Sequence, residues 1–122
     1  MTTPWGPSQD VVTIVPGLAH WFNTASHGGM KINLDAYPLP PDVLARPFIR
    51  TFKTIDGSGA RSWAWLEEDC EWAWAIVQHP ELADGLAAAW HGDDPERIRR
   101  AAADTVETLR ARAIRDARSV AP

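Results

Sequence analysis

The chain has 122 residues, a formal net charge of −4 and a single cysteine, Cys70. This length fits one domain, and a lone cysteine excludes an internal disulfide. A negative chain lacks the positive field that phosphate-backbone binding needs, so we expect no direct binding to nucleic acid. The first seven residues lack the basic region and apolar run typical of a signal peptide, and no stretch reaches about 20 apolar residues. We therefore expect a cytoplasmic protein without a signal peptide or membrane contact.

The first half of the chain, residues 1–66, is rich in turn residues and β-branched residues. Apolar runs bounded by glycine and proline predict strands at 11–15, 18–23, 30–34, 48–55 and 61–65. Short links between the first three favour an antiparallel meander. Four prolines between residues 35 and 47 exclude a continuous element there, although one helical turn fits 42–45.

The second half, residues 67–122, predicts about three helices. Apolar residues recur at helical spacing from 67 to 78, and Pro80 then separates this helix from a second one that runs through Trp90. Asp94-Pro95 predicts the N-cap and first residue of a last helix of about 24 residues. The sequence therefore predicts one α+β domain over 1–122. Its N-terminal antiparallel sheet has three to five strands, packed by about three C-terminal helices.

Negative charge is concentrated in the middle of the chain. Residues 61–93 contain one arginine against seven carboxylates, a balance of −6, and four of the seven occur within five residues: Glu67, Glu68, Asp69 and Glu71. The dipole at a helix start favours carboxylates, so stability alone can explain the run. Facing solvent, the same side chains would bind arginines of a protein partner. Their spacing fits neither a calcium loop nor a zinc helix, and we predict no metal and no cofactor.

His27-Gly28-Gly29 is a second candidate site. Two glycines allow positive φ and close approach of backbone N–H groups to a ligand. Successive N–H groups can bind an anion, with the histidine as acid, base or donor. The alternative is a tight turn between strands with His27 at its tip. A small enzyme could also pair His27 with Glu68 or Asp69 as general acid and base.

The seven tryptophans favour an aromatic core, because each buries a large apolar area. A tryptophan-lined binding surface is the alternative, and Trp65, beside the acidic run, is its candidate contact. Cys70 lies between Asp69 and Glu71, where negative charge disfavours a thiolate. We therefore expect it to be a small core residue.

Four segments, 5–9, 17–18, 24–29 and 65–73, resemble an uncharacterised family of short domains from bacterial plasmids, integrative elements and phages. The markers are His-Gly-Gly followed by Trp-x-Glu-Glu-Asp-Cys, and the resemblance covers residues 4–80. Leu66 stands where the family pattern has tyrosine. The resemblance implies no established reaction. It does imply a mobile-element setting, in which small acidic proteins often block nucleic-acid-guided defences.

Together these features favour a small, non-enzymatic acidic binding protein of a mobile genetic element. We expect an anti-CRISPR-like inhibitor of a basic host protein or ribonucleoprotein complex. The predicted contact residues are Glu67, Glu68, Asp69, Glu71, His27, Gly28, Gly29 and Trp65. Two alternatives remain open. One is a small enzyme using His27 with Glu68 or Asp69, and the other is a regulatory or structural homodimer formed through the last helix.

Overall fold

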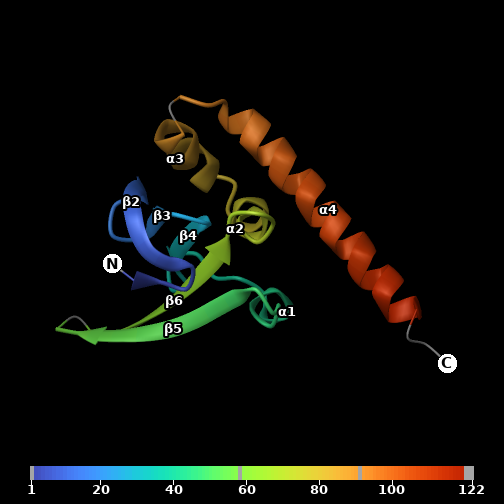
Figure 1. The fold of residues 1–122 in the computed structure, drawn as a ribbon, viewed down its shortest axis with the longest axis horizontal. Helices are drawn as coiled ribbons and strands as arrows, with labels where there is room; N and C mark the ends of the chain where they lie inside the picture. The colour runs from blue at the N-terminus through green and yellow to red at the C-terminus, as the bar shows by residue number, and fades with distance from the viewer. Residues whose placement is uncertain (1, 58, 91, 120–122) are drawn as a thin grey trace.

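The computed structural model of the chain describes residues 2–57, 59–90 and 92–119. It confirms the predicted α+β fold: an N-terminal antiparallel sheet curls into a half-barrel, and helices follow it (Figure 1). The strands are β1 (Thr2–Thr3), β2 (Gly6–Val15), β3 (Ala19–Thr24), β4 (Gly28–Asn33), β5 (Ile49–Asp56) and β6 (Gly59–Glu67). The helices are α1 (Pro41–Leu44), α2 (Trp72–Gln78), α3 (Leu82–Ala89) and α4 (Pro95–Ser119).

The six strands lie in the order β1-β2-β3-β4-β6-β5, and every neighbouring pair is antiparallel. The predicted meander therefore holds from β2 to β4. Beyond β4 the order changes, because β6 pairs with β4 and leaves β5 at the edge of the sheet. The short strand β1, which pairs with the start of β2, is a sixth strand that the sequence pattern did not indicate.

The predicted start of the second-half helix at residue 67 is wrong. Glu67 still belongs to β6, where it pairs with Gly29, and the backbone N–H of Glu68 donates to the carbonyl of Gly28 at 3.0 Å. A turn over residues 68–71 follows, and α2 begins only at Trp72. Hydrogen bonds to β4 thus extend the strand into the acidic run, so these carboxylates occupy a strand end and a turn.

The main core lies between one face of the sheet and the helices. Met30, Ile32 and Leu66 from the sheet are fully buried, as are large apolar residues of α2 and α3. The last helix contributes Ile98, Ala102, Val106 and Leu109 to this core, while its residues 110–118 are exposed. The Asp94 carboxylate accepts a hydrogen bond from the backbone N–H of Glu96 at 3.0 Å, which confirms the predicted N-cap.

The opposite face of the sheet carries a second, aromatic cluster. Trp65 contacts Trp5, Phe22 and Phe52, with ring centroids 5.7, 5.1 and 5.8 Å away, respectively. Five of the seven tryptophans are buried in one cluster or the other, which confirms that tryptophans build the interior. In the described residues, none of the helices is both long and apolar enough to cross a membrane.

Candidate functional site

Two turns meet at one end of the sheet and bring the predicted acidic residues beside His27. The β3–β4 turn ends at His27, directly before β4, and the β6–α2 turn carries Glu68 and Asp69. Single ligand atoms of His27, Glu67 and Asp69 all lie within 4.8 Å of one another. The Glu68 carboxylate lies on the Gly28 side, where an added Cβ would sit 3.2 Å from its Oε2 atom. We call His27, Glu67, Glu68 and Asp69 the acidic site.

The acidic site combines exposed and partly buried carboxylates. His27 and Asp69 are exposed, while Glu67 and Glu68 are half-buried. Among the described residues, no ion pair involves Glu67, Glu68 or Asp69. Partial burial raises the pKa of Glu67, and the hydrogen bond and negative charge of Asp69 raise it further, against a smaller opposing effect of His27. The site is therefore a concentration of negative charge that a cation would relieve.

Glu71 does not belong to the acidic site, contrary to the expectation that it faces solvent. Its side chain is only 3% exposed. Arg46 Nε donates to one carboxylate oxygen at 2.8 Å and Nη2 to the other at 3.1 Å, which makes the pair bidentate. The Arg46 guanidinium also lies over the Trp74 ring, 5.0 Å from its centroid. Glu71 is thus a structural residue that the protein neutralises internally.

The prediction that Gly28 and Gly29 form an anion-binding loop is wrong. Both lie in β4, and neither has a positive φ. Their role is close packing: a Cβ at Gly29 would lie 2.2 Å from the Trp5 ring and 2.4 Å from the Leu66 carbonyl oxygen. A Cβ at Gly28 would lie 2.8 Å from the carbonyl oxygen of Phe22. Any side chain here would force the sheet and Trp5 apart, so glycine is needed for contact rather than for a turn.

The tight-turn interpretation of His27 agrees with the geometry. The Thr24 hydroxyl accepts from the His27 N–H at 3.0 Å and donates to the His27 carbonyl at 2.5 Å. These bonds close the turn between Thr24 and His27, and His27 is exposed. Trp65, the remaining predicted contact, is buried among aromatic rings. It supports the sheet beneath the acidic site and offers little surface to a partner.

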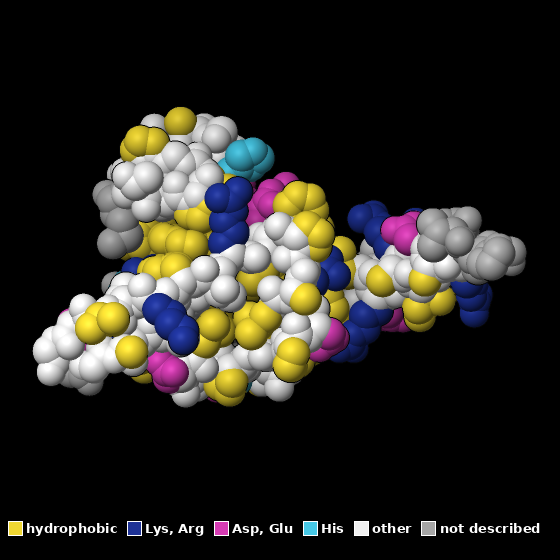
Figure 2. Space-filling view, turned by 90° about the horizontal axis from the view of Figure 1, so that it is seen from below, with side chains coloured by type: hydrophobic (Ala, Val, Ile, Leu, Met, Phe, Trp, Pro, Cys, Tyr) yellow, Lys and Arg dark blue, Asp and Glu magenta, His cyan; other side chains and the backbone are white. Residues whose placement is uncertain are grey.

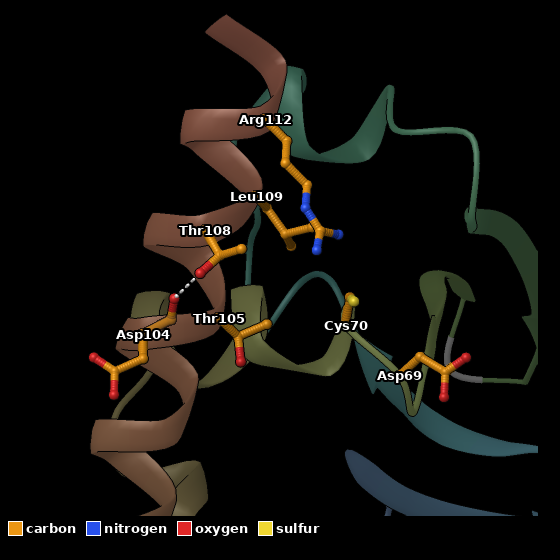
Figure 3. A pocket seen from close by; sticks show the side chains of 7 residues that line it. All are labelled: Asp69, Cys70, Asp104, Thr105, Thr108, Leu109 and Arg112. Carbon is orange, nitrogen blue, oxygen red and sulfur yellow. Dashed lines mark hydrogen bonds between the residues drawn. The ribbon is translucent and has the colours of Figure 1, made fainter. Parts of the chain in front are cut away.

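Two adjoining pockets flank Cys70, on the side of the turn that faces α4. One has a volume of about 280 Å³ and extends to Asp104, Thr105 and Thr108 of α4. The other, of about 250 Å³, extends to Arg46 and Phe48. Arg112 lines both pockets, and Figure 3 shows its side chain reaching from α4 toward the turn with Asp69 and Cys70.

Arg46 and Arg112 line the pockets beside the acidic site and were not predicted from the sequence. Arg46 is in a proline-rich connection with no motif around it. The arginines of α4 alternate with acids, a pattern that a solvated helix face explains by itself. Only the packing of α1 and α4 around the β6–α2 turn brings Arg46 to Glu71 and Arg112 to the pockets beside Asp69, so no local signal identified them.

The acidic site is chemically suited to cations. Two carboxylates and an imidazole supply oxygen and nitrogen ligands, so His27, Glu67 and Asp69 could hold a divalent ion. The same carboxylates could accept the paired N–H groups of a partner's arginine. The site is open to solvent on the His27 side, which suits the binding of a side chain from another molecule.

Comparison with known protein families assigns the chain to one of them. Residues 1–121 match the model of a domain of unknown function, DUF7007. The chain belongs to the DUF7007 family. This match includes α4, so the family covers more of the chain than the resemblance over residues 4–80 did. No curated protein and no solved structure matches this DUF7007 domain.

Proposed function

We propose that this DUF7007 domain is a small, non-enzymatic binding protein whose acidic site receives basic side chains of a protein partner. One observation carries this proposal: Glu67, Glu68 and Asp69 share one end of the sheet and make no ion pair with any residue that the structure describes, whereas nearby Glu71 is neutralised by Arg46. The fold thus distinguishes a structural carboxylate from three that stay available. Binding of a cation gives the largest electrostatic stabilisation to carboxylates that repel one another in the free protein.

The energetics of such an interface favour arginine as the main partner residue. Its planar guanidinium can bond two carboxylate oxygens at once. Removing one member of a desolvated, hydrogen-bonded charge pair at an interface typically costs about 2–5 kcal/mol. A negative patch also accelerates encounter with a positive surface, and added salt weakens this effect. Affinity for the partner should therefore fall as ionic strength rises.

The partner class that fits best is a host protein or ribonucleoprotein complex that handles nucleic acid through a Lys- and Arg-lined groove. An acidic domain inhibits such a complex by occupying the groove in place of phosphates. The resemblance to mobile-element domains supports this counter-defence role, which would make the protein anti-CRISPR-like. Direct binding of this domain to nucleic acid is not part of the proposal.

The test compares two triple variants with the same change in charge. One removes the acidic site (E67Q, E68Q and D69N), and the other removes exposed acids elsewhere (D42N, E81Q and E107Q). Each variant, immobilised after its fold is checked by circular dichroism, captures protein from host lysate at 50 and 300 mM salt. We expect loss of the nucleic-acid-handling complex with the first variant and retention with the second. Equal capture by both variants would overturn the proposal.

A second candidate, a small enzyme, is favoured by the convergence of His27 with Asp69. A general base needs an oriented imidazole, and the nearby carboxylate supplies the orienting charge. Stoichiometry separates the two functions. A binding inhibitor acts only near one equivalent of its target, whereas an enzyme inactivates an excess and loses this ability in H27Q. Inactivation of a fiftyfold molar excess of the target would support the enzyme.

A homodimer formed through α4 is favoured by the exposed end of that helix. Ile114 is 56% exposed and lines a hollow of about 400 Å³ together with Val77 and Val106. Sedimentation of the chain truncated after Asp93, beside the full chain and I114D, tests it. A dimer that I114D converts to a monomer would support this role, and a monomeric full chain at 100 µM would exclude it.

A further inference from the structure

The aromatic face of the half-barrel contains Lys31, which makes no ion pair with any residue that the structure describes. Strand register places Lys31 of β4 directly opposite Trp65 of β6 and His20 of β3, so all three share this face. The Lys31 ammonium lies over three rings, with Nζ 4.5, 5.5 and 5.7 Å from the centroids of Trp63, Phe52 and Trp65, respectively. We call Lys31, Phe52, Trp63 and Trp65 the lysine–aromatic site.

The ring faces stabilise the Lys31 cation but do not satisfy it. Cation–π contacts are electrostatic, whereas an ammonium also carries three N–H donors that need acceptor atoms. In the part of the chain that the structure describes, Lys31 makes neither an ion pair nor a hydrogen bond. Partial burial lowers the pKa of Lys31, since less water remains to solvate its charge. The Lys31 ammonium therefore has N–H donors that an anionic acceptor could use.

The charged and aromatic residues around Lys31 indicate the charge and shape of the anion that fits. Arg50 lies opposite Trp65 on β5 and is exposed, so it adds a second positive charge to this face. Glu67 and Asp69 lie beyond Trp65 and repel a multiply charged ligand such as a phosphate chain. Phe52 is half-buried and stacks on Trp63 and Trp65, at interplanar angles of 15° and 21°. A flat apolar group therefore has the half-buried Phe52 ring to pack against, beside the Lys31 ammonium and on the same face as the Arg50 guanidinium.

This face is partly accessible, because Lys31 and Phe52 are half-buried and Arg50 is exposed. Viewed from below, the molecule shows a hollow where hydrophobic side chains lie beside basic and acidic ones (Figure 2). We propose that the lysine–aromatic site binds a small organic monocarboxylate with a flat, aromatic body. The carboxylate accepts hydrogen bonds from Lys31, and the body packs against Phe52. This site is separate from the acidic site and does not depend on its function.

Phenylacetate is the probe, and its neutral isostere phenylacetamide is the matched ligand control. Acetate, which lacks the ring, tests the flat body. Binding to the full-length ¹⁵N-labelled chain at pH 7 is followed through the indole N–H signals of Trp63 and Trp65. A charge-assisted hydrogen bond predicts that phenylacetate binds at least about tenfold more tightly than phenylacetamide or acetate.

Three variants test the role of Lys31. K31M should remove the preference for phenylacetate over phenylacetamide, and K31R should keep it. K53M is the control, because Lys53 alternates with Phe52 on β5 and so faces the other side of the sheet. Its preference should stay unchanged. If K31M fails to fold, the affinities of wild type, K31R and K53M for the three ligands still test the proposal.

Four outcomes would overturn the proposal: no shift with 20 mM phenylacetate, equal affinity for phenylacetate and phenylacetamide, equal affinity for acetate, or an unchanged preference in K31M. Oligothymidine is added in a separate titration at 50 mM salt. Should it shift the same indole signals at lower concentration than phenylacetate does, the face binds single-stranded nucleic acid instead.

Discussion

The Arg46–Glu71 ion pair connects the proline-rich segment after β4 to the start of α2, and replacing Arg46 with methionine tests its contribution to stability. The carboxylate is almost fully buried, with 3% of the side chain exposed, whereas 23% of Arg46 is exposed. Breaking a buried pair by removing one partner typically costs about 3–5 kcal/mol, because an uncompensated charge remains inside. Water reaches the Arg46 side of this pair, so we expect R46M to cost about 3 kcal/mol.

The double variant R46M/E71Q separates the cost of an unpaired charge from the loss of the pair itself. With both charges removed, no ion stays buried, and methionine still covers Trp74. We expect the double variant to be at least about 1.5 kcal/mol more stable than R46M, since replacing both partners of a buried pair is often nearly neutral. The control is R61M, because Arg61 and Asp56 are 3.8 Å apart and 41% and 52% exposed. An exposed pair contributes about 0–1 kcal/mol.

Urea denaturation at pH 7, followed by tryptophan fluorescence, measures the four free energies of unfolding. A total stability of about 5–15 kcal/mol is usual for a domain, so a loss of 3 kcal/mol is readily resolved. The reasoning fails if R46M is no less stable than R61M. It also fails if R46M/E71Q is as unstable as R46M, because the buried charge would then not be the cause.

Two further predictions concern the residues around the acidic site. G29A should lower stability by about 2 kcal/mol or more, because its Cβ would lie 2.2 Å from the Trp5 ring; thermal denaturation checks this against G57A, where no atom lies within 4 Å of the new Cβ and little change is expected. E67Q should stabilise the protein at pH 7, since burial and Asp69 raise the pKa of Glu67 and its charge therefore opposes folding. This cost disappears as the pH falls through the raised pKa, so urea midpoints of E67Q and wild type should converge at pH 3.5; an equal difference at both pH values would contradict the assignment.

Local patterns predicted most elements because their causes are local. Apolar runs bounded by turn residues indicated β3 to β6 to within two residues and the second half of β2, and Asp94-Pro95 marked the start of α4. The two-residue strand β1 was missed because two threonines carry no periodic signal. The start of α2 was misplaced because a tertiary interaction, the pairing of Glu67 with Gly29, overrides the helical preference of the acidic run.

The sequence by itself determined the class of fold, the concentration of acids in the middle of the chain and the aromatic character of the interior, since each depends on composition and short-range order. Only the tertiary structure decided what individual residues do. It paired Glu71 with Arg46, packed Trp5 against Gly29, and brought His27 beside Glu67 and Asp69. These contacts join segments that are far apart along the chain, and their geometry follows from strand order and register, which no local pattern of residues encodes.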